Sequence, residues 1–277
     1  MLARVAAAVA LMATASYGAA VALVPGGGGA GTSSAPAARD VAFSTTATCD
    51  MTTVGALSAR HPEVRQFVVM QTSTFTDTTG TVEVAVRSDD GRWHCQRGPQ
   101  AASFGRAGTR PLTDRRSGDD TTPAGVFPLG LVTAWDGQTF SIFGNQPDPG
   151  VLAPYRSVRY EDCWGAVKNT ARYQHLVSMP GCTGPDEWLR KIGDVYAHAA
   201  VIGANLDPIS GDAPGETPYA AAIFLHRHGY SSSGAPLATS GCVSLAMADL
   251  VDTVRLLDPR LHPHFAIGPT SWLRDSA

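Results

Sequence analysis

The sequence predicts a mainly β fold, a sandwich or barrel of short strands with one clear helix. Short apolar or alternating segments recur along the chain, separated by turns rich in glycine and proline. Residues 246–257 alone repeat apolar side chains at helical spacing over several turns. The composition is that of a globular protein, with 277 residues, 16% charged residues and a net charge of -3. It argues against nucleic acid as a partner.

The N-terminus reads as an export signal. Arg4 precedes an apolar stretch from Val5 to Val24, which is typical of a secretory signal peptide. A stretch of this length could also remain as an uncleaved anchor, which would then be the one membrane contact. We expect residues 1–24 to be this signal or anchor and residues 25–40 to be a flexible linker, because their small residues have little to bury. A single domain with an N-terminal β-hairpin extension is expected over 41–277.

The predicted strands follow in order. Phe67–Met70 is apolar throughout, and Thr81–Val86 alternates between apolar and polar residues. Asp89-Asp90-Gly91 is a turn signal, so Arg92–Cys95 is expected to complete a hairpin with the preceding strand. Further strands are predicted at Gly125–Val132, Phe140–Phe143, Val195–Ile202, Ala221–His226 and Phe265–Gly268.

The predicted helix spans Ala246–Leu257, with Ser244 as its N-cap and Asp258-Pro259 as its end. Cys242 is then expected at the junction of a loop and a helix start. Free backbone N–H groups and the helix dipole would lower the thiol pKa there. Shorter helices are predicted at Arg60–Met70 and Asp186–Ile192.

The chain has five cysteines, which matters if it is exported. In an oxidising compartment an even set pairs, and an odd one is left as a free thiol. Pairing of sequence neighbours predicts the bridges Cys49–Cys95 and Cys163–Cys182, although the sequence does not fix the connectivity. Cys242 is then the unpaired cysteine.

A histidine and this cysteine flank one loop. His226 ends the apolar run Ile223-Phe224-Leu225, and Gly241-Cys242 follows a loop rich in serine and glycine. A free thiol has a pKa near ~8.5 and needs a basic neighbour to react at neutral pH. Imidazole can take the thiol proton and pass it to a leaving group, so the pair predicts nucleophilic catalysis.

These segments resemble the L,D-transpeptidase catalytic domain family (YkuD-type). The strand ending at His226, the motif Thr239-Ser240-Gly241-Cys242-Val243 and the following helix match the family's pattern. Gly118–Phe127, which contains Thr122-Pro123, is similar to the family's Thr-Pro-x-Gly-x-Phe segment. The resemblance covers about Gln96–Gly268 and implies a YkuD-like β-sandwich.

The resemblance implies an exported enzyme of the cell wall or a periplasm-like space, whose partners are peptidoglycan stem peptides. Cys242 would form a thioester acyl-enzyme with His226 as base, and a second amine would take the acyl group to form a cross-link. Water as acceptor would make it an L,D-carboxypeptidase. No cofactor and no metal are expected. The backbone N–H groups of Gly241 and Cys242 are candidate oxyanion donors. Residues that could line the substrate site are His228, Thr239, Ser240, Thr122 and Pro123.

Several alternatives remain open. Arg227 and Ser244 stand where the family often has other residues, so a non-catalytic cell-wall-binding protein is an alternative, as is a sortase-like enzyme. His228-Gly229 also resembles the family's histidine motif, although His226 fits better as the end of the strand. Cys242 could be a structural cysteine and His226 a core histidine. His226 and His228 with Cys242 resemble half of a zinc site, but no acidic residue is well placed to complete it.

Overall fold

The structure is a computed structural model that describes residues 48–277, apart from 168–169, 180–181, 183, 185 and 207–216. The predicted leader and linker lie outside the described residues. The described residues belong to one compact unit, Ala42–Ala277. None of the helices in this described part is long and apolar enough to cross a membrane.

Most strands belong to one sheet, which in the described residues has eleven members. Its strands, in spatial order, are β4 (Thr109–Pro111), β5 (Thr122–Pro128), β16 (Pro263–Pro269), β1 (Gln66–Thr72), β2 (Thr79–Arg87), β3 (Trp93–Ser103), β15 (Val243–Leu245), β14 (Phe224–Arg227), β13 (Ala199–Val201), β8 (Ile142–Gly144) and β9 (Tyr155–Ser157). Two smaller sheets contain β11 (Leu176–Ser178), β10 (Asp162–Trp164) and β12 (Glu187–Trp188), and β6 (Val132–Thr133) with β7 (Thr139–Phe140).

The helices are short. They are α1 (Met51–Arg60), η1 (Leu112–Asp114), α2 (Leu189–Ile192), η2 (Gly193–Tyr196), α3 (Met247–Leu256), η3 (Pro259–Leu261) and α4 (Thr270–Asp275). The mainly β fold is therefore as the sequence predicts.

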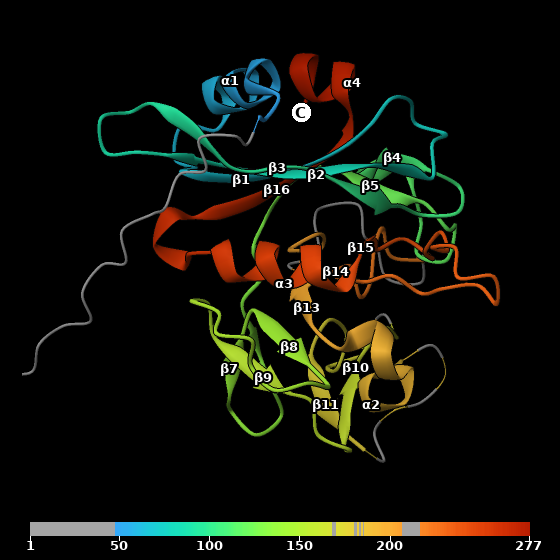
Figure 1. The fold of residues 1–277 in the computed structure, drawn as a ribbon. Helices are drawn as coiled ribbons and strands as arrows, with labels where there is room; N and C mark the ends of the chain where they lie inside the picture. The colour runs from blue at the N-terminus through green and yellow to red at the C-terminus, as the bar shows by residue number, and fades with distance from the viewer. Residues whose placement is uncertain (1–47, 168–169, 180–181, 183, 185, 207–216) are drawn as a thin grey trace, which may run out of the picture. The chain divides into compact units, whose positions relative to one another are not determined.

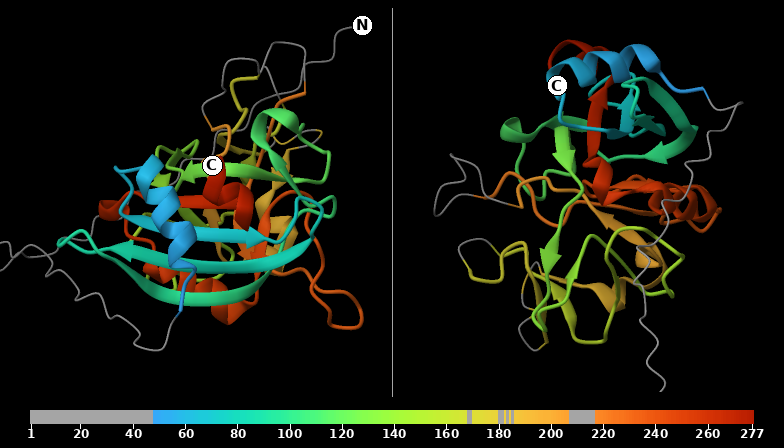
Figure 2. Two further views of the ribbon diagram at one scale, coloured as in Figure 1. Left: turned by 90° about the horizontal axis from the view of Figure 1, so that it is seen from above. Right: turned by 90° about the vertical axis from the view of Figure 1, so that its left-hand side faces the viewer.

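The central strands are buried on both faces. Because side chains alternate along a strand, Val68 and Met70 of β1 enter one apolar cluster, whereas Phe67 and Val69 enter another. The second cluster lies under α1 and α4, which cover the same face of the sheet (Figures 1 and 2). The first cluster includes the inner side of α3.

A third apolar cluster lies at the β14 end of the sheet. Phe224 of β14 packs edge to face against Phe143, Trp164 and Tyr196, with ring centroids 4.8–5.6 Å apart. The small sheet of β10 to β12 and the helices α2 and η2 supply much of this packing. The side of β14 that carries Phe224 is therefore packed against a cluster of aromatic rings.

One predicted element is wrong and another is shorter than predicted. Residues 60–70 are not a helix: Arg60 ends α1, and β1 follows at Gln66. The strand predicted at Phe67–Met70 is the apolar centre of β1, which is apolar on both sides because both faces of the strand are covered. The strand expected over 195–202 is shorter, since η2 extends to Tyr196 and β13 covers only Ala199–Val201.

Two further segments differ from the prediction in detail. The segment 125–132 divides into β5 and β6. Of the helix predicted at 186–192, only Leu189–Ile192 is helical, and Glu187–Trp188 form β12.

Both predicted disulfides are present. Cys49–Cys95 joins the start of α1 to β3, and Cys163–Cys182 joins β10 to the segment before β12. Cys242 is the free cysteine among the described residues.

Candidate active site

His226 lies in the interior of the sheet. In β14 it pairs with Ala199 of antiparallel β13 on one side and with Ser244 of parallel β15 on the other. Phe224 and Leu225 begin this strand, and the apolar side chains cover both its faces. His226 points to the same face as Phe224 and is only 6% exposed.

The hydrogen bond of His226 fixes which ring nitrogen can act as a base. Its Nδ1 lies 2.7 Å from the backbone oxygen of Arg227. A carbonyl can only accept, so Nδ1 carries the hydrogen and Nε2 carries the lone pair. Burial lowers the pKa of His226 to about 4, against the opposing effect of the Arg227 hydrogen bond. The imidazole is therefore neutral and able to accept a proton at Nε2.

Cys242 lies directly before β15, on the face that carries Phe224 and His226. Its sulfur accepts a hydrogen bond from the Phe224 N–H and donates one to the Ala222 carbonyl, each at 3.4 Å. Because Cys242 precedes the register pair Leu225–Val243, it is level with Phe224, and Ser244 is level with His226. Cys242 thus lies on the chain segment next to β14, two residues before the level of His226.

The resting thiol is protonated, contrary to the expectation from the sequence. Burial raises the pKa of Cys242 to about 12, the negative charge of Glu187 adds to this, and the Phe224 hydrogen bond and Arg115 oppose it. The helix dipole does not act on this sulfur, because β15 separates Cys242 from α3, which begins at Met247. Within the described residues, no hydrogen bond joins the Cys242 sulfur to His226.

The His228 ring forms its hydrogen bond with Ser244 and not with Cys242. Its Nδ1 lies 2.9 Å from the Ser244 hydroxyl, and its backbone N–H donates to Leu245. Ser244 is therefore not the N-cap of α3; that position is Ala246, which makes no side-chain capping bond. The arrangement makes His228 a support for β15 and leaves His226 as the imidazole beside the cysteine.

Two threonines hold the cysteine backbone. The Cys242 carbonyl accepts hydrogen bonds from Thr239 Oγ1 at 2.6 Å and from Thr122 Oγ1 at 3.2 Å. Gly241 has a φ of 141°, a conformation that favours glycine. Its N–H donates to Thr239 Oγ1 at 3.1 Å, so it is not free as the oxyanion donor expected from the sequence. The Cys242 N–H has no partner among the described residues.

The other predicted lining residues are further from the chemistry. Ser240 is exposed, and its hydroxyl accepts from Arg106 at 2.7 Å. Pro123 is buried in β5, where it pairs with Arg110 of β4. Thr122-Pro123 is therefore the start of a strand, in which Thr122 alone contacts the cysteine.

Arg115 is a neighbour of the cysteine that the sequence did not reveal. It is 1% exposed and bonds Thr121, the Tyr219 carbonyl and Asp119. Its Nη2 lies 3.6 Å from the place where a side chain on Gly241 would begin. Its positive charge lowers the pKa of the Cys242 thiol. No periodicity or motif marks this arginine, which follows η1 in an irregular segment.

Glu187 and Tyr196 form a second group that the sequence did not reveal. The Tyr196 hydroxyl donates a short hydrogen bond to Glu187 Oε2. The Tyr196 ring packs edge to face on His226, with centroids 5.6 Å apart, and on Phe224. Burial raises the pKa of the Glu187 carboxyl. An acidic group is thereby held on the same face of β14 as His226 and Cys242.

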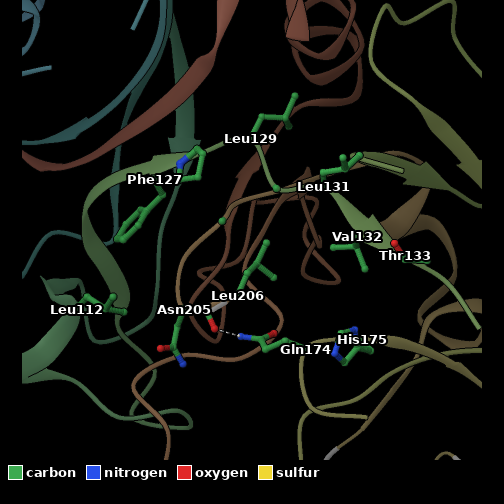
Figure 3. A pocket seen from close by; sticks show the side chains of 13 residues that line it. Leu112, Phe127, Leu129, Leu131, Val132, Thr133, Gln174, His175, Asn205 and Leu206 are labelled. Carbon is green, nitrogen blue, oxygen red and sulfur yellow. Dashed lines mark hydrogen bonds between the residues drawn. The ribbon is translucent and has the colours of Figure 1, made fainter. Parts of the chain in front are cut away.

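A separate pocket of about 510 Å³ lies elsewhere (Figure 3). Neither Cys242 nor His226 lines it; its walls include Leu112, Phe127, Leu129, Leu131, Val132, Thr133, His175 and Leu206. At its base Gln174 donates to the Asn205 and Ala220 carbonyls and accepts from the Ala222 N–H. Gln174 thus helps to fix Ala222, whose carbonyl receives the Cys242 thiol.

The comparison with protein families decides the assignment. The sequence model of YkuD, the L,D-transpeptidase catalytic domain, matches residues 79–261, which is more than half of the chain. The chain belongs to this family. Comparisons with curated proteins and with solved structures found no match. In the described part of this L,D-transpeptidase domain, no group of three or more histidine, cysteine or acidic side chains is placed to hold a metal ion.

Proposed function

We propose that this L,D-transpeptidase domain cross-links peptidoglycan stem peptides outside the cell through a thioester on Cys242. The observation that carries the proposal is the placement of Cys242 and His226 on one face of adjacent parallel strands, with the His226 Nε2 kept as a base by the Arg227 carbonyl. Export is supported by the apolar N-terminal segment and by two disulfides, which persist in oxidising compartments.

In the first half-reaction the Cys242 sulfur attacks an amide carbonyl of the donor stem. Rotation about the Cα–Cβ bond of Cys242 replaces the long contact to Ala222 with one to His226, and the thiol proton passes to Nε2 as the C–S bond forms. The C–N bond then breaks, and His226 gives the proton to the leaving amine. Because both groups are neutral at rest, the thiol loses its proton only when substrate is bound.

The negative charge that develops on the carbonyl oxygen must be stabilised by hydrogen-bond donors. The unpartnered Cys242 N–H is one, and a single such donor typically contributes ~3 kcal/mol to the transition state. The buried Arg115 supplies positive charge beside the same peptide segment. Together they take over the role expected of the Gly241 N–H, which is bound to Thr239.

The test is acyl-enzyme formation with a carbapenem, followed by intact mass. The wild-type protein should gain the mass of one carbapenem, whereas Cys242→Ala should gain none and should not cross-link stem peptides. Circular dichroism of both proteins controls for folding. An adduct that persists in Cys242→Ala, or normal cross-linking by that variant, would refute the assignment.

A non-catalytic wall-binding protein is the second candidate. It is favoured by the raised pKa of Cys242 and by the two hydrogen bonds that engage its sulfur away from His226. A folded wild-type protein that binds peptidoglycan but gains no carbapenem mass would support this alternative. An L,D-carboxypeptidase would instead form the acyl-enzyme and release it only to water.

A further inference from the structure

Glu187 is an acidic side chain beside the nucleophile that no described cation neutralises. Among the described residues its one hydrogen-bond partner is the Tyr196 hydroxyl, and no described lysine, arginine or histidine forms an ion pair with it. Holding a carboxylate in a largely apolar site without a cation costs free energy. Such a site is suited to binding a cation from outside.

The neighbours of Glu187 contact the strand that carries His226. β12 pairs with β10, so that Glu187 lies beside Trp164, whose ring packs on Phe224. The hydroxyl that binds Glu187 belongs to the ring that packs on His226. The charge of Glu187 also reaches the sulfur, since it raises the pKa of Cys242. Glu187 as a residue is half-buried rather than fully buried, so a ligand can approach it.

The second half-reaction leaves one proton without an acceptor. At neutral pH an alkyl amine arrives as an ammonium ion, which must lose one proton before its nitrogen can attack and another after the C–N bond has formed. His226 can take the second proton and return it to the sulfur as the C–S bond breaks. The first proton therefore needs a different base.

We propose that Glu187 binds the ammonium group of the acyl acceptor and takes the first of its two protons. This inference rests on the proposed transpeptidase function and names the chemical class of the acceptor, a primary alkylammonium. Glu187 passes the proton to water at its exposed side, the neutral nitrogen attacks the thioester carbon, and the second proton reaches the Cys242 sulfur through His226. Tyr196 is a positioning residue that orients the Glu187 carboxylate.

The test uses Glu187→Gln in the full chain, with Glu161→Gln as the matched control because Glu161 is exposed. Carbapenem acylation is measured first and shows that each variant is folded and forms an acyl-enzyme, and in Glu161→Gln its rate should match the wild type. A donor stem peptide is then offered with an alkyl diamine or with hydroxylamine, which is uncharged at neutral pH. Amide product and hydrolysed donor are separated by mass spectrometry.

We expect Glu187→Gln to transfer to the alkyl diamine about 100-fold more slowly than the wild type, while transfer to hydroxylamine is unchanged. Glu161→Gln should behave as the wild type with both nucleophiles. Normal acylation with undiminished diamine transfer in Glu187→Gln would overturn this inference alone, and so would an equal loss with both nucleophiles. Failure of the wild type to form any acyl-enzyme would overturn the proposed function and this inference with it.

Discussion

At the scale of single residues, the site has a neutral thiol beside a neutral imidazole. Burial moves the two pKa values apart, that of Cys242 to about 12 and that of His226 to about 4. An ion pair would need the opposite order, because the thiol would have to be more acidic than the imidazolium. On the proposed mechanism, the free protein should resist indiscriminate alkylation, and reactivity should depend on a substrate that turns the sulfur toward His226.

Iodoacetamide and a carbapenem should therefore give different pH profiles. Alkylation of the free protein should be slow at neutral pH and should rise through pH ~8.5, the usual thiol pKa, toward about 12 without a plateau, because only the thiolate reacts. Acylation by the carbapenem needs a neutral imidazole and a protonated thiol, so its rate should be level above about pH 4 and fall only as the Cys242 pKa is approached. Stopped-flow rates with both reagents test this. Alkylation that is already maximal at neutral pH would contradict it.

At the scale of elements, the site depends on the register of β14 and β15. The pairing of His226 with Ser244 places Cys242 two residues before the level of His226, and the turn at Gly241 sets where β15 begins. A Cβ at Gly241 would lie 3.0 Å from the Thr121 backbone oxygen, in addition to the strain of its φ. The glycine thus lets the cysteine segment lie close to the segment that carries Arg115.

Gly241→Ala should disturb both stability and chemistry. The strained backbone and the close Thr121 contact should lower the free energy of unfolding by about 1–3 kcal/mol and slow carbapenem acylation. Gly234→Ala is the control, since Gly234 also has a positive φ, 81°, but a Cβ there meets nothing within 4 Å. Urea unfolding and acylation rates measure the two effects. Equal acylation rates in the two variants would show that the close approach at Gly241 is unimportant for the site.

The elements also show what a sequence can and cannot predict. β14 and the Gly241-Cys242 turn were predictable, because an apolar run and a local motif determine them. β15 is not predictable from the sequence, where a loop and the N-cap Ser244 are expected instead, since three residues give no periodic signal. α1 was missed even though Asp50 caps it through the Thr53 N–H, because its pattern is only weakly amphipathic.

Tertiary neighbours could not be predicted. Arg115 and Glu187 reach the site from an irregular segment and a two-residue strand, each far from Cys242 in the sequence. The raised pKa of the thiol results from burial, which depends on those distant segments. The sequence therefore predicts the proposed reacting pair, Cys242 and His226, but not the electrostatic environment in which the structure places them.

At the scale of the whole molecule, one disulfide stabilises the face opposite α3. Cys49–Cys95 closes a loop with a sequence separation of 46 and attaches α1 to β3. Replacing both cysteines by serine should lower the free energy of unfolding by about 4 kcal/mol, because the unfolded chain loses a constraint. Carbapenem acylation should remain normal, because α1 packs on the apolar cluster of the other sheet face. Denaturant unfolding and intact mass test both parts. A variant that is fully stable but inactive would contradict this separation of roles.

The order of the strands has a consequence for biogenesis. β16 is the last strand of the described chain, yet it lies between β5 and β1, parallel to β1. Until it arrives, the inner edges of both neighbours have unpaired backbone groups that are prone to aggregation. The main sheet therefore cannot be completed before residues 263–269 are available. If the protein is exported as proposed, that delay would favour translocation, because the sheet stays incomplete until its last strand is available.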